Sequence, residues 1–282
     1  MDDLAPLRLA VVASRHGGAS LAARVRKLGG AVFADLLHDI SRAELDRADE
    51  EASGLTARGV NAVLLGSPEY PHLLSLARQA PPFLFYTGSS DLMASRGIGM
   101  CGSRNASSEG LRAAAACSEV AAQQRLTVIS GYARGVDTVA HVSALSSGGT
   151  TIIVLPEGID HFRVKRGPVS DEWDPKRVLV VSQFPPGKPW SAAGAMARNG
   201  VIIGLSLALV VVEAGEKGGT RAAGTKALQQ NKPVLTLEFT ENPPGNAELI
   251  RLGAISAKSR MEFRTQLVQV TKDPQGSQLS FA

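Results

Sequence analysis

The apolar positions of the first 65 residues repeat at the spacing of short amphipathic helices. Between residues 21 and 32, Leu or Val recurs every three or four positions with arginine and lysine between them, and Gly29-Gly30 forms an internal break. Ser41 stands three residues before Glu44, which is the pattern of a capping box at the start of a helix. We therefore expect a helical N-terminal extension over residues 1–65.

Proline and glycine punctuate the next segment, residues 66–94. Proline fixes φ and donates no backbone hydrogen bond, so its repeated use disfavours regular structure. The apolar run from Phe83 to Tyr86 is long enough for one short strand. This segment is predicted to be a linker with turns and that strand.

From Gly97 onward, apolar runs of strand length alternate with helical segments. Continuous apolar strands separated by helices favour a mostly parallel sheet covered on both faces. We expect a doubly wound α/β domain over residues 95–262, followed by a polar tail over 263–282 that is partly disordered from Thr265 on. The expected strands are Ile98–Cys101, Leu126–Ser130, Thr150–Leu155, Val178–Ser182, Leu207–Glu213 and Val234–Phe239, and the clearest helices are Glu109–Arg125 and Val136–Ser146.

Composition places the chain among globular proteins. Of its 282 residues 44% are hydrophobic and 20% are charged, and the net charge of +4 permits a polyanionic partner without requiring one. The two cysteines, Cys101 and Cys117, predict a reducing compartment and no disulfide framework. The chain has no apolar run of membrane-spanning length and begins with acidic residues rather than a signal peptide. We expect a cytoplasmic protein that does not enter the membrane.

The first segment that suits chemistry follows the first strand of the expected sheet. Ligands of open parallel sheets bind at the carboxyl ends of the strands. Gly102 and Ser103 let a backbone approach an anion there, the following helix offers free N–H groups, and Arg104 adds hydrogen-bond donors. The alternative is a tight turn capped by serine, with Arg104 in solvent.

A second such segment follows the next strand. Gly131 and Gly135 flank Arg134, which again suits a phosphate group. Asp137 and His141 stand four residues apart on the expected helix and form a candidate polar pair. Because no serine or cysteine stands at a nucleophile position beside them, the structural interpretation of this pair is preferred to a catalytic dyad.

Two further segments are less specific. Arg198-Asn199 precedes an apolar run. A glycine-rich loop over residues 215–221, which ends at Arg221, either binds a phosphate group or simply connects a strand to a helix. The charged segment 161–188 has the pattern of a solvated loop. Trp173 and Trp190 suit either base stacking or packing.

The sequence predicts neither a metal site nor a cofactor. Five histidines are scattered along the chain, and neither cysteine has a partner at metal-ligand spacing. The GxxxxGK[ST] pattern of P-loop ATPases is absent.

Taken in order, these segments resemble the DNA-processing protein A family, DprA, also called Smf. The resemblance covers about residues 66–256. It rests on collinear pieces, each weak alone: Pro71-His72-Leu73-Leu74, Pro81-Pro82-Phe83-Leu84-Phe85-Tyr86-Thr87-Gly88, Gly102-Ser103-Arg104, Ser130-Gly131-Tyr132-Ala133-Arg134-Gly135-Val136-Asp137, Ala140-His141, Gly148-Gly149-Thr150-Thr151-Ile152, Gly158-Ile159-Asp160, Arg198-Asn199, Gly204-Leu205-Ser206 and Val211-Val212-Glu213-Ala214.

The resemblance implies a Rossmann-like domain behind a helical extension, and a non-catalytic protein. Members bind single-stranded DNA in a basic pocket, form homodimers, protect incoming DNA and load the RecA recombinase in natural transformation. The implied DNA-binding residues are Gly102, Ser103, Arg104, Gly131, Arg134, Gly135, Arg198 and Asn199, to which the glycine-rich loop adds Arg221.

Several positions depart from the family pattern. The usual Tyr-Pro and Asn after Gly158-Ile159-Asp160 are replaced by residues 161–165, and Gln183 stands where a Glu is usual. The usual Arg-Asn-Arg ends in Gly200, which removes one positive charge, and the chain ends before the winged-helix domain of some members. These departures indicate a divergent member, for which a plasmid, phage or defence role is an alternative to transformation.

Two other functions remain open. The loop at 215–221 is similar to that of Lonely-guy-type phosphoribohydrolases, which suggests a nucleotide-binding or nucleotide-sensing protein. That family's motif has a catalytic Glu after Gly-Thr, whereas no Glu occurs here between Thr220 and Leu237, which argues against hydrolysis but not against nucleotide binding. The other alternative is a dimeric scaffold that has lost its pocket.

Overall fold

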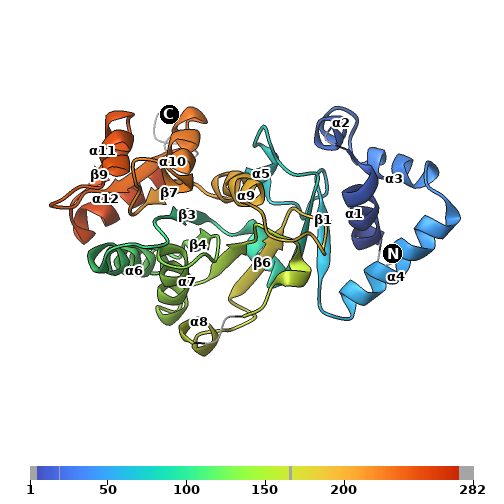
Figure 1. Ribbon diagram of the computed structural model, residues 1–282, viewed down its shortest axis with the longest axis horizontal. Helices are drawn as coiled ribbons and strands as arrows, with labels where there is room; N and C mark the ends of the chain where they lie inside the picture. Colours follow the sequence, from blue (N-terminus) through green and yellow to red (C-terminus); the bar gives the residue numbers. More distant parts are fainter. Residues whose placement is uncertain (1–4, 19, 165–166, 273–282) are drawn as a thin grey trace, which may run out of the picture. The chain divides into compact units, whose positions relative to one another are not determined.

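The computed structural model describes residues 5–18, 20–164 and 167–272 (Figure 1). These residues form two compact units, each built from two stretches of the chain. Unit 1 combines the chain up to Ser95 with Thr151–Leu205, and unit 2 combines Arg96–Thr150 with the chain from Ser206 onward. The sequence-based domain boundaries lie elsewhere and stay a prediction.

Unit 1 begins with the expected short helices. Gly29, with φ +80°, ends the second of them, which accounts for the break in the sequence pattern. The Ser41 hydroxyl accepts the Glu44 N–H, and the Glu44 carboxylate accepts the Ser41 N–H, so the predicted capping box is confirmed. The helices are α1 (Ala5–His16), α2 (Leu21–Leu28), α3 (Ala31–His38) and α4 (Arg42–Thr56).

The sheet of unit 1 has the strand order β1-β2-β6-β5. β1 and β2 are antiparallel, as are β2 and β6, whereas β5 and β6 are parallel. The strand expected inside the linker is therefore β2, hydrogen-bonded on both sides, and a strand that the sequence analysis did not predict, β1, pairs with it. The bounds are β1 (Asn61–Leu64), β2 (Phe83–Gly88), β5 (Thr151–Val154) and β6 (Val178–Ser182).

Shorter elements connect these strands, and one long helix packs on them. Gly204 of α9 lies where a Cβ would stand 2.4 Å from Leu74, so glycine permits α9 to pack closely on α5. The elements are α5 (His72–Ser75), α8 (Pro168–Asp171), α9 (Ala192–Leu205) and 3₁₀ helices at Ser90–Ala94 and Ile159–His161.

The sheet of unit 2 is wholly parallel, in the order β4-β3-β7-β8-β9. From β3 the chain moves through α6 to β4, while β7 pairs with the other side of β3 and leads through α10 to β8. The strand order therefore switches between β3 and β7. The elements are β3 (Gly97–Cys101), α6 (Ser108–Gln123), β4 (Thr127–Ser130), α7 (Val136–Ser146), β7 (Ala208–Val211), α10 (Gly219–Gln229), β8 (Val234–Leu237), α11 (Pro244–Arg251), β9 (Ile255–Ala257) and α12 (Arg260–Thr271).

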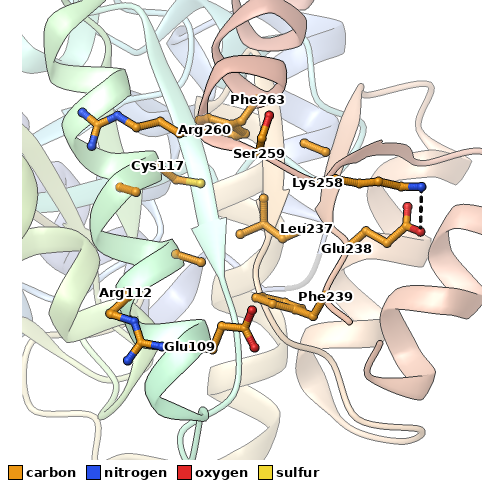
Figure 2. A pocket seen from close by; sticks show the side chains of 13 residues that line it. Glu109, Arg112, Cys117, Leu237, Glu238, Phe239, Lys258, Ser259, Arg260 and Phe263 are labelled. Atoms are coloured by element: carbon orange, nitrogen blue, oxygen red, sulfur yellow. Dashed lines mark ion pairs between the residues drawn. The ribbon is translucent and has the colours of Figure 1, made fainter. Parts of the chain in front are cut away.

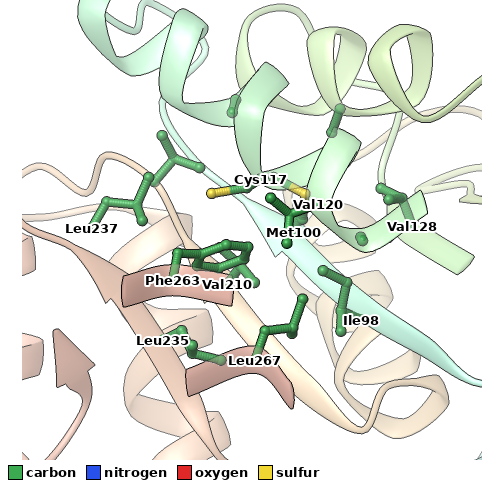
Figure 3. Close-up of a cluster of buried hydrophobic side chains, with 14 of the residues drawn as sticks. Ile98, Met100, Cys117, Val120, Val128, Val210, Leu235, Leu237, Phe263 and Leu267 are labelled. Carbon is green, nitrogen blue, oxygen red and sulfur yellow. The ribbon is translucent and has the colours of Figure 1, made fainter. Parts of the chain in front are cut away.

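Helices cover both faces of this sheet (Figure 1). One face carries a buried apolar cluster that joins α6, α7 and α12 to the strands (Figure 3). Met100 and Val210 from neighbouring strands meet Phe263 and Leu267 of α12 in it. On the other side lie α10 and α11, which pack against β7 and β8. The Rossmann-like, mostly parallel α/β fold expected from the sequence is confirmed.

The expectation of a polar tail from residue 263 is wrong as far as Thr271. Phe263 and Leu267 are one helical turn apart and fully buried, while Arg264 and Thr265 between them are exposed, so α12 is an amphipathic helix. The many polar residues in this segment hid its narrow apolar stripe. The remainder of the expected disordered tail, residues 273–282, lies outside the described residues.

None of the helices in the described ranges combines the length and the apolar character that crossing a membrane requires.

We predict that Phe263→Ala lowers the free energy of unfolding by about 3–5 kcal/mol, because it leaves a cavity in a packed core. Met261, two residues earlier on the same helix and 78% exposed, provides the control. Met261→Ala should change stability by less than about 0.5 kcal/mol. Urea unfolding measures both, and equal losses would contradict the packing of α12 described above.

Candidate nucleic-acid interface

Two loops meet at the carboxyl ends of β3 and β4. These strands are adjacent and parallel, so residues 102–107 after β3 lie beside residues 131–135 after β4. The Val136 N–H donates to the Ser103 carbonyl at 3.3 Å, which joins the second loop to the first. The structure therefore brings together six of the predicted DNA-binding residues: Gly102, Ser103, Arg104, Gly131, Arg134 and Gly135.

Two exposed arginines mark this pair of loops. Arg104 belongs to the first loop and Arg134 to the second. The Arg134 guanidinium donates a hydrogen bond to the side-chain oxygen of Asn105, so it lies across the first loop. Two guanidinium groups consequently stand on neighbouring loops at one edge of the sheet, and guanidinium groups match the geometry of phosphate.

Glycine permits the close approach of the two loops. Gly135 has a φ of +83°, and a Cβ there would stand 2.5 Å from the Ser103 carbonyl oxygen. A Cβ on Gly102 would stand 2.4 Å from Val136. Both glycines thus have a packing role, whether or not the backbone also contacts a ligand.

The start of α6 already holds a negative charge. The Glu213 carboxylate, which follows β7, accepts the Ser107 N–H at 3.0 Å and also accepts the Ser107 hydroxyl. The Ser107 hydroxyl oxygen in turn accepts the Gly110 N–H at 2.9 Å, and a Cβ on Gly110 would overlap the carboxylate. The expectation that free N–H groups at this helix start receive phosphate is therefore wrong for these two amides.

Asp137 and His141 lie in the interior below the second loop. The Asp137 carboxylate accepts the Ala133 N–H at 3.3 Å, and the His141 ring packs against Tyr132 with 5.9 Å between ring centroids. Tyr132 itself has a φ of +61°. Both polar residues are buried and contact the loop that carries Arg134, so they help to fix its shape.

The glycine-rich loop after β7 is anchored by a buried asparagine. The Asn246 side chain accepts the Ala214 N–H and donates to the carbonyls of Val212 and Leu237, each at 2.7 Å. Sequence analysis missed both Asn246 and the contact of Glu213 with α6. Glu213 had one available signal, since it directly follows an apolar strand and is part of the family resemblance.

Arg221 belongs to α10, which packs against α11. A hydrogen bond from Arg251, with further contributions from the charges of Arg251 and Arg221, lowers the pKa of Glu248 on α11. Arg221 is half-buried in the first turn of α10. Its predicted contact with DNA is untested.

Arg198 and Asn199 belong to unit 1. They lie in the middle of α9, where Arg198 is buried with 6% of its surface exposed and Asn199 is half-buried. Because the loops described above belong to unit 2, the structure does not group these two residues with them. Their role in the same site stays a prediction.

Unit 2 also contains a pocket of about 360 Å³ at the carboxyl ends of β8 and β9 (Figure 2). Its floor is apolar, and burial raises the pKa of Cys117 there. At its rim, Lys258 pairs with Glu238 at 3.3 Å and Arg260 with Glu119 at 2.5 Å. In the described part of the chain, no three His, Cys, Asp or Glu side chains are grouped so as to hold a metal ion.

Comparison with models of known protein families shows to which family the chain belongs. The DNA recombination-mediator protein A family matches residues 61–267, which include every strand of both sheets. The chain belongs to this family. The resemblance to DprA and Smf proteins inferred from the sequence is thereby confirmed.

Curated relatives in the family include proteins named DprA and Smf. The DNA processing protein DprA of Streptococcus pneumoniae is 32% identical over 168 residues, 60% of this chain and 59% of the relative. The Smf protein of Synechocystis is 31% identical over 218 residues, 75% of this chain and 55% of the relative. The matches thus span between half and two thirds of these relatives' length.

Solved structures of the family share the fold. The X-ray structure of S. pneumoniae DprA superposes with a TM-score of 0.70 and 25% identity, covering 96% of this chain and 95% of that one. A DNA processing protein A from Helicobacter pylori, described for its single-stranded DNA binding mode, has a TM-score of 0.66 and 20% identity and covers 74% of this chain and 96% of that one.

We predict that Glu213→Ala lowers the free energy of unfolding of this family member by about 1–2 kcal/mol. The substitution removes an acceptor of two hydrogen bonds and a favourable charge at the start of α6. Glu216, exposed in the following loop, provides the control, and Glu216→Ala should be nearly neutral. Chemical denaturation measures both, and a neutral Glu213→Ala would contradict the capping role.

Proposed function

We propose that the protein binds single-stranded DNA without catalysis, through the loops that follow β3 and β4. The observation that carries this proposal is the pair of exposed arginines, Arg104 and Arg134, on two loops that contact each other. Family membership supports DNA as the ligand, since the family is one of recombination mediators. The H. pylori protein of the same fold binds single-stranded DNA, which favours that form of DNA.

Side chains rather than helix N-termini supply the charge in this proposal. Because the Glu213 carboxylate caps α6, a phosphate near that helix start is repelled by a charge of the same sign. The guanidinium groups lie on the solvent side of the loops, where they can hold backbone phosphates in the forked geometry that arginine provides. Binding of this kind needs no nucleophile, general base or metal ion, which supports a non-enzymatic role.

The wider role proposed for the chain follows that of the family. As a homodimer it would protect incoming single strands and help load a RecA-type recombinase, in natural transformation or in another recombination pathway. Arg198, Asn199 and Arg221 are proposed as additional DNA contacts. Each of these can be tested by the same binding measurement as the two loop arginines.

We predict that Arg104→Glu or Arg134→Glu weakens binding of a labelled single-stranded oligonucleotide by at least about tenfold near 0.1 M salt. Each reversal removes a phosphate contact, so the slope of log affinity against log salt should also fall by about 1. Fluorescence anisotropy at several salt concentrations measures both quantities.

Arg24, exposed on α2, provides a matched control for charge reversal. Arg24→Glu should leave the affinity within about twofold, and thermal unfolding should show that all three variants are folded. Unchanged affinity and salt slope in both loop variants would place the DNA site elsewhere. Competition by free nucleotides but not by oligonucleotides would instead favour the nucleotide-sensing alternative.

A further inference from the structure

Trp190 exposes half of its surface to solvent, whereas the other tryptophan of the chain has a packing partner. Trp190 is 51% exposed, in the loop between β6 and α9. Trp173 lies against Phe162, with 5.8 Å between ring centroids. Tryptophan is highly buried on average in folded proteins. Packing therefore accounts for Trp173 and leaves the exposed indole of Trp190 unexplained.

The loop that carries Trp190 is held firmly by backbone hydrogen bonds. The Gly158 N–H donates to the Lys188 carbonyl at 2.8 Å, and the Asp160 N–H donates to the Pro186 carbonyl at 3.1 Å. Prolines at 185, 186 and 189 further restrict the backbone. An exposed aromatic ring on a restricted loop loses little conformational entropy when a ligand covers it.

Packing at the N-terminus of α9 does not account for the exposed ring of Trp190 either. Ser191 caps α9, because its hydroxyl accepts the Gly194 N–H at 3.0 Å. Trp190 thus occupies the position before the cap, where an apolar residue often packs against the fourth residue of the helix. That residue is Ala195, whose single methyl group covers little of an indole ring, and half of Trp190 stays exposed.

The charges around this loop favour a polyanion. Lys188 lies with Nζ 3.6 Å from the centroid of the Phe184 ring, and Arg163 is exposed beside the same loop pair, since it donates to the Asp160 carbonyl at 2.8 Å. Arg58 neutralises Asp160 through an ion pair of 2.9 Å. The described residues of these loops also include His161, whose ring bonds the Gly187 carbonyl at 3.0 Å, and the half-buried Glu157.

We propose that Trp190 is a stacking residue that receives one nucleobase of a bound single strand. An exposed aromatic ring beside cations is the combination by which proteins bind single strands regardless of sequence. The proposal rests on the proposed DNA-binding function and adds unit 1 to the binding surface. Trp190 stands in the loop directly before α9, the helix that carries the predicted DNA contact Arg198.

The spectroscopic test uses a variant with one tryptophan. Trp173→Phe keeps an aromatic ring against Phe162 and leaves Trp190 as the single tryptophan of the chain. Titration with unlabelled oligo(dT) should quench the emission of Trp190 in parallel with binding followed by anisotropy. Binding without any change in this emission would overturn the stacking proposal while leaving the DNA-binding function intact.

The affinity test compares Trp190→Ala, Trp190→Phe and an exposed apolar control, Leu28→Ala on α2, which is 62% exposed in the wild type. Trp190→Ala should weaken oligo(dT) binding about 5- to 100-fold with an unchanged salt slope, and Trp190→Phe should restore part of the affinity. Leu28→Ala should have no effect. Thermal unfolding of each variant verifies that α9 and its surroundings remain folded.

An abasic oligonucleotide separates stacking from other causes. It keeps the phosphates and lacks the bases, so Trp190→Ala should bind it as well as the wild type does. Equal weakening on abasic and normal strands would overturn the proposal. Normal DNA binding with impaired recombinase loading would also overturn it and assign Trp190 to a protein partner, whereas failure of the wild type to bind any strand would refute the DNA-binding function itself.

Discussion

The parallel pairing of β3 with both β4 and β7 is the constraint on which the candidate site depends. It places the carboxyl ends of three strands side by side, although the loops after β3 and β7 lie more than 100 positions apart in the sequence. Three different contacts hold these loops in place. Gly135 lets two backbones approach, Glu213 reaches the start of α6, and Asn246 fixes the base of the third loop.

These devices separate the structural charges from the exposed ones. The Glu213 carboxylate points at backbone and hydroxyl donors, where it satisfies groups that a helix start leaves without partners. Arg104 and Arg134 remain on the solvent side. The acidic group at the switch in strand order therefore belongs to the framework, and the positive charge is left for a partner.

Much of the fold followed from local sequence patterns. The buried strands of unit 2 are continuous apolar runs, and the capping box at Ser41 depends on two residues only three positions apart. Shorter or more polar elements escaped notice. β9 has three residues, and the apolar stripe of α12 consists of a few residues within a polar segment.

The candidate site was less predictable than the fold, because its contacts join distant parts of the chain. The arginines could be named from their glycine-rich surroundings, and the strand order then brought two of them together. Glu213 bonds Ser107, 106 positions away, and Asn246 bonds residues 9, 32 and 34 positions away, so no pattern within a single helix or strand reveals these contacts. Arg198 lies in unit 1, whereas the two arginine-bearing loops lie in unit 2, and the sequence pattern around Arg198 did not reveal this division.

The close approach of Gly135 to the Ser103 carbonyl has a consequence for the DNA binding proposed above. The hydrogen bond from the Val136 N–H to the Ser103 carbonyl links the two loops, so the positions of Arg104 and Arg134 depend on each other. A ligand that contacts both arginines therefore has to adapt its own conformation to them. A flexible single strand can rotate its backbone torsions until its phosphates meet the guanidinium groups, whereas a duplex offers phosphates only at the intervals that its helix dictates.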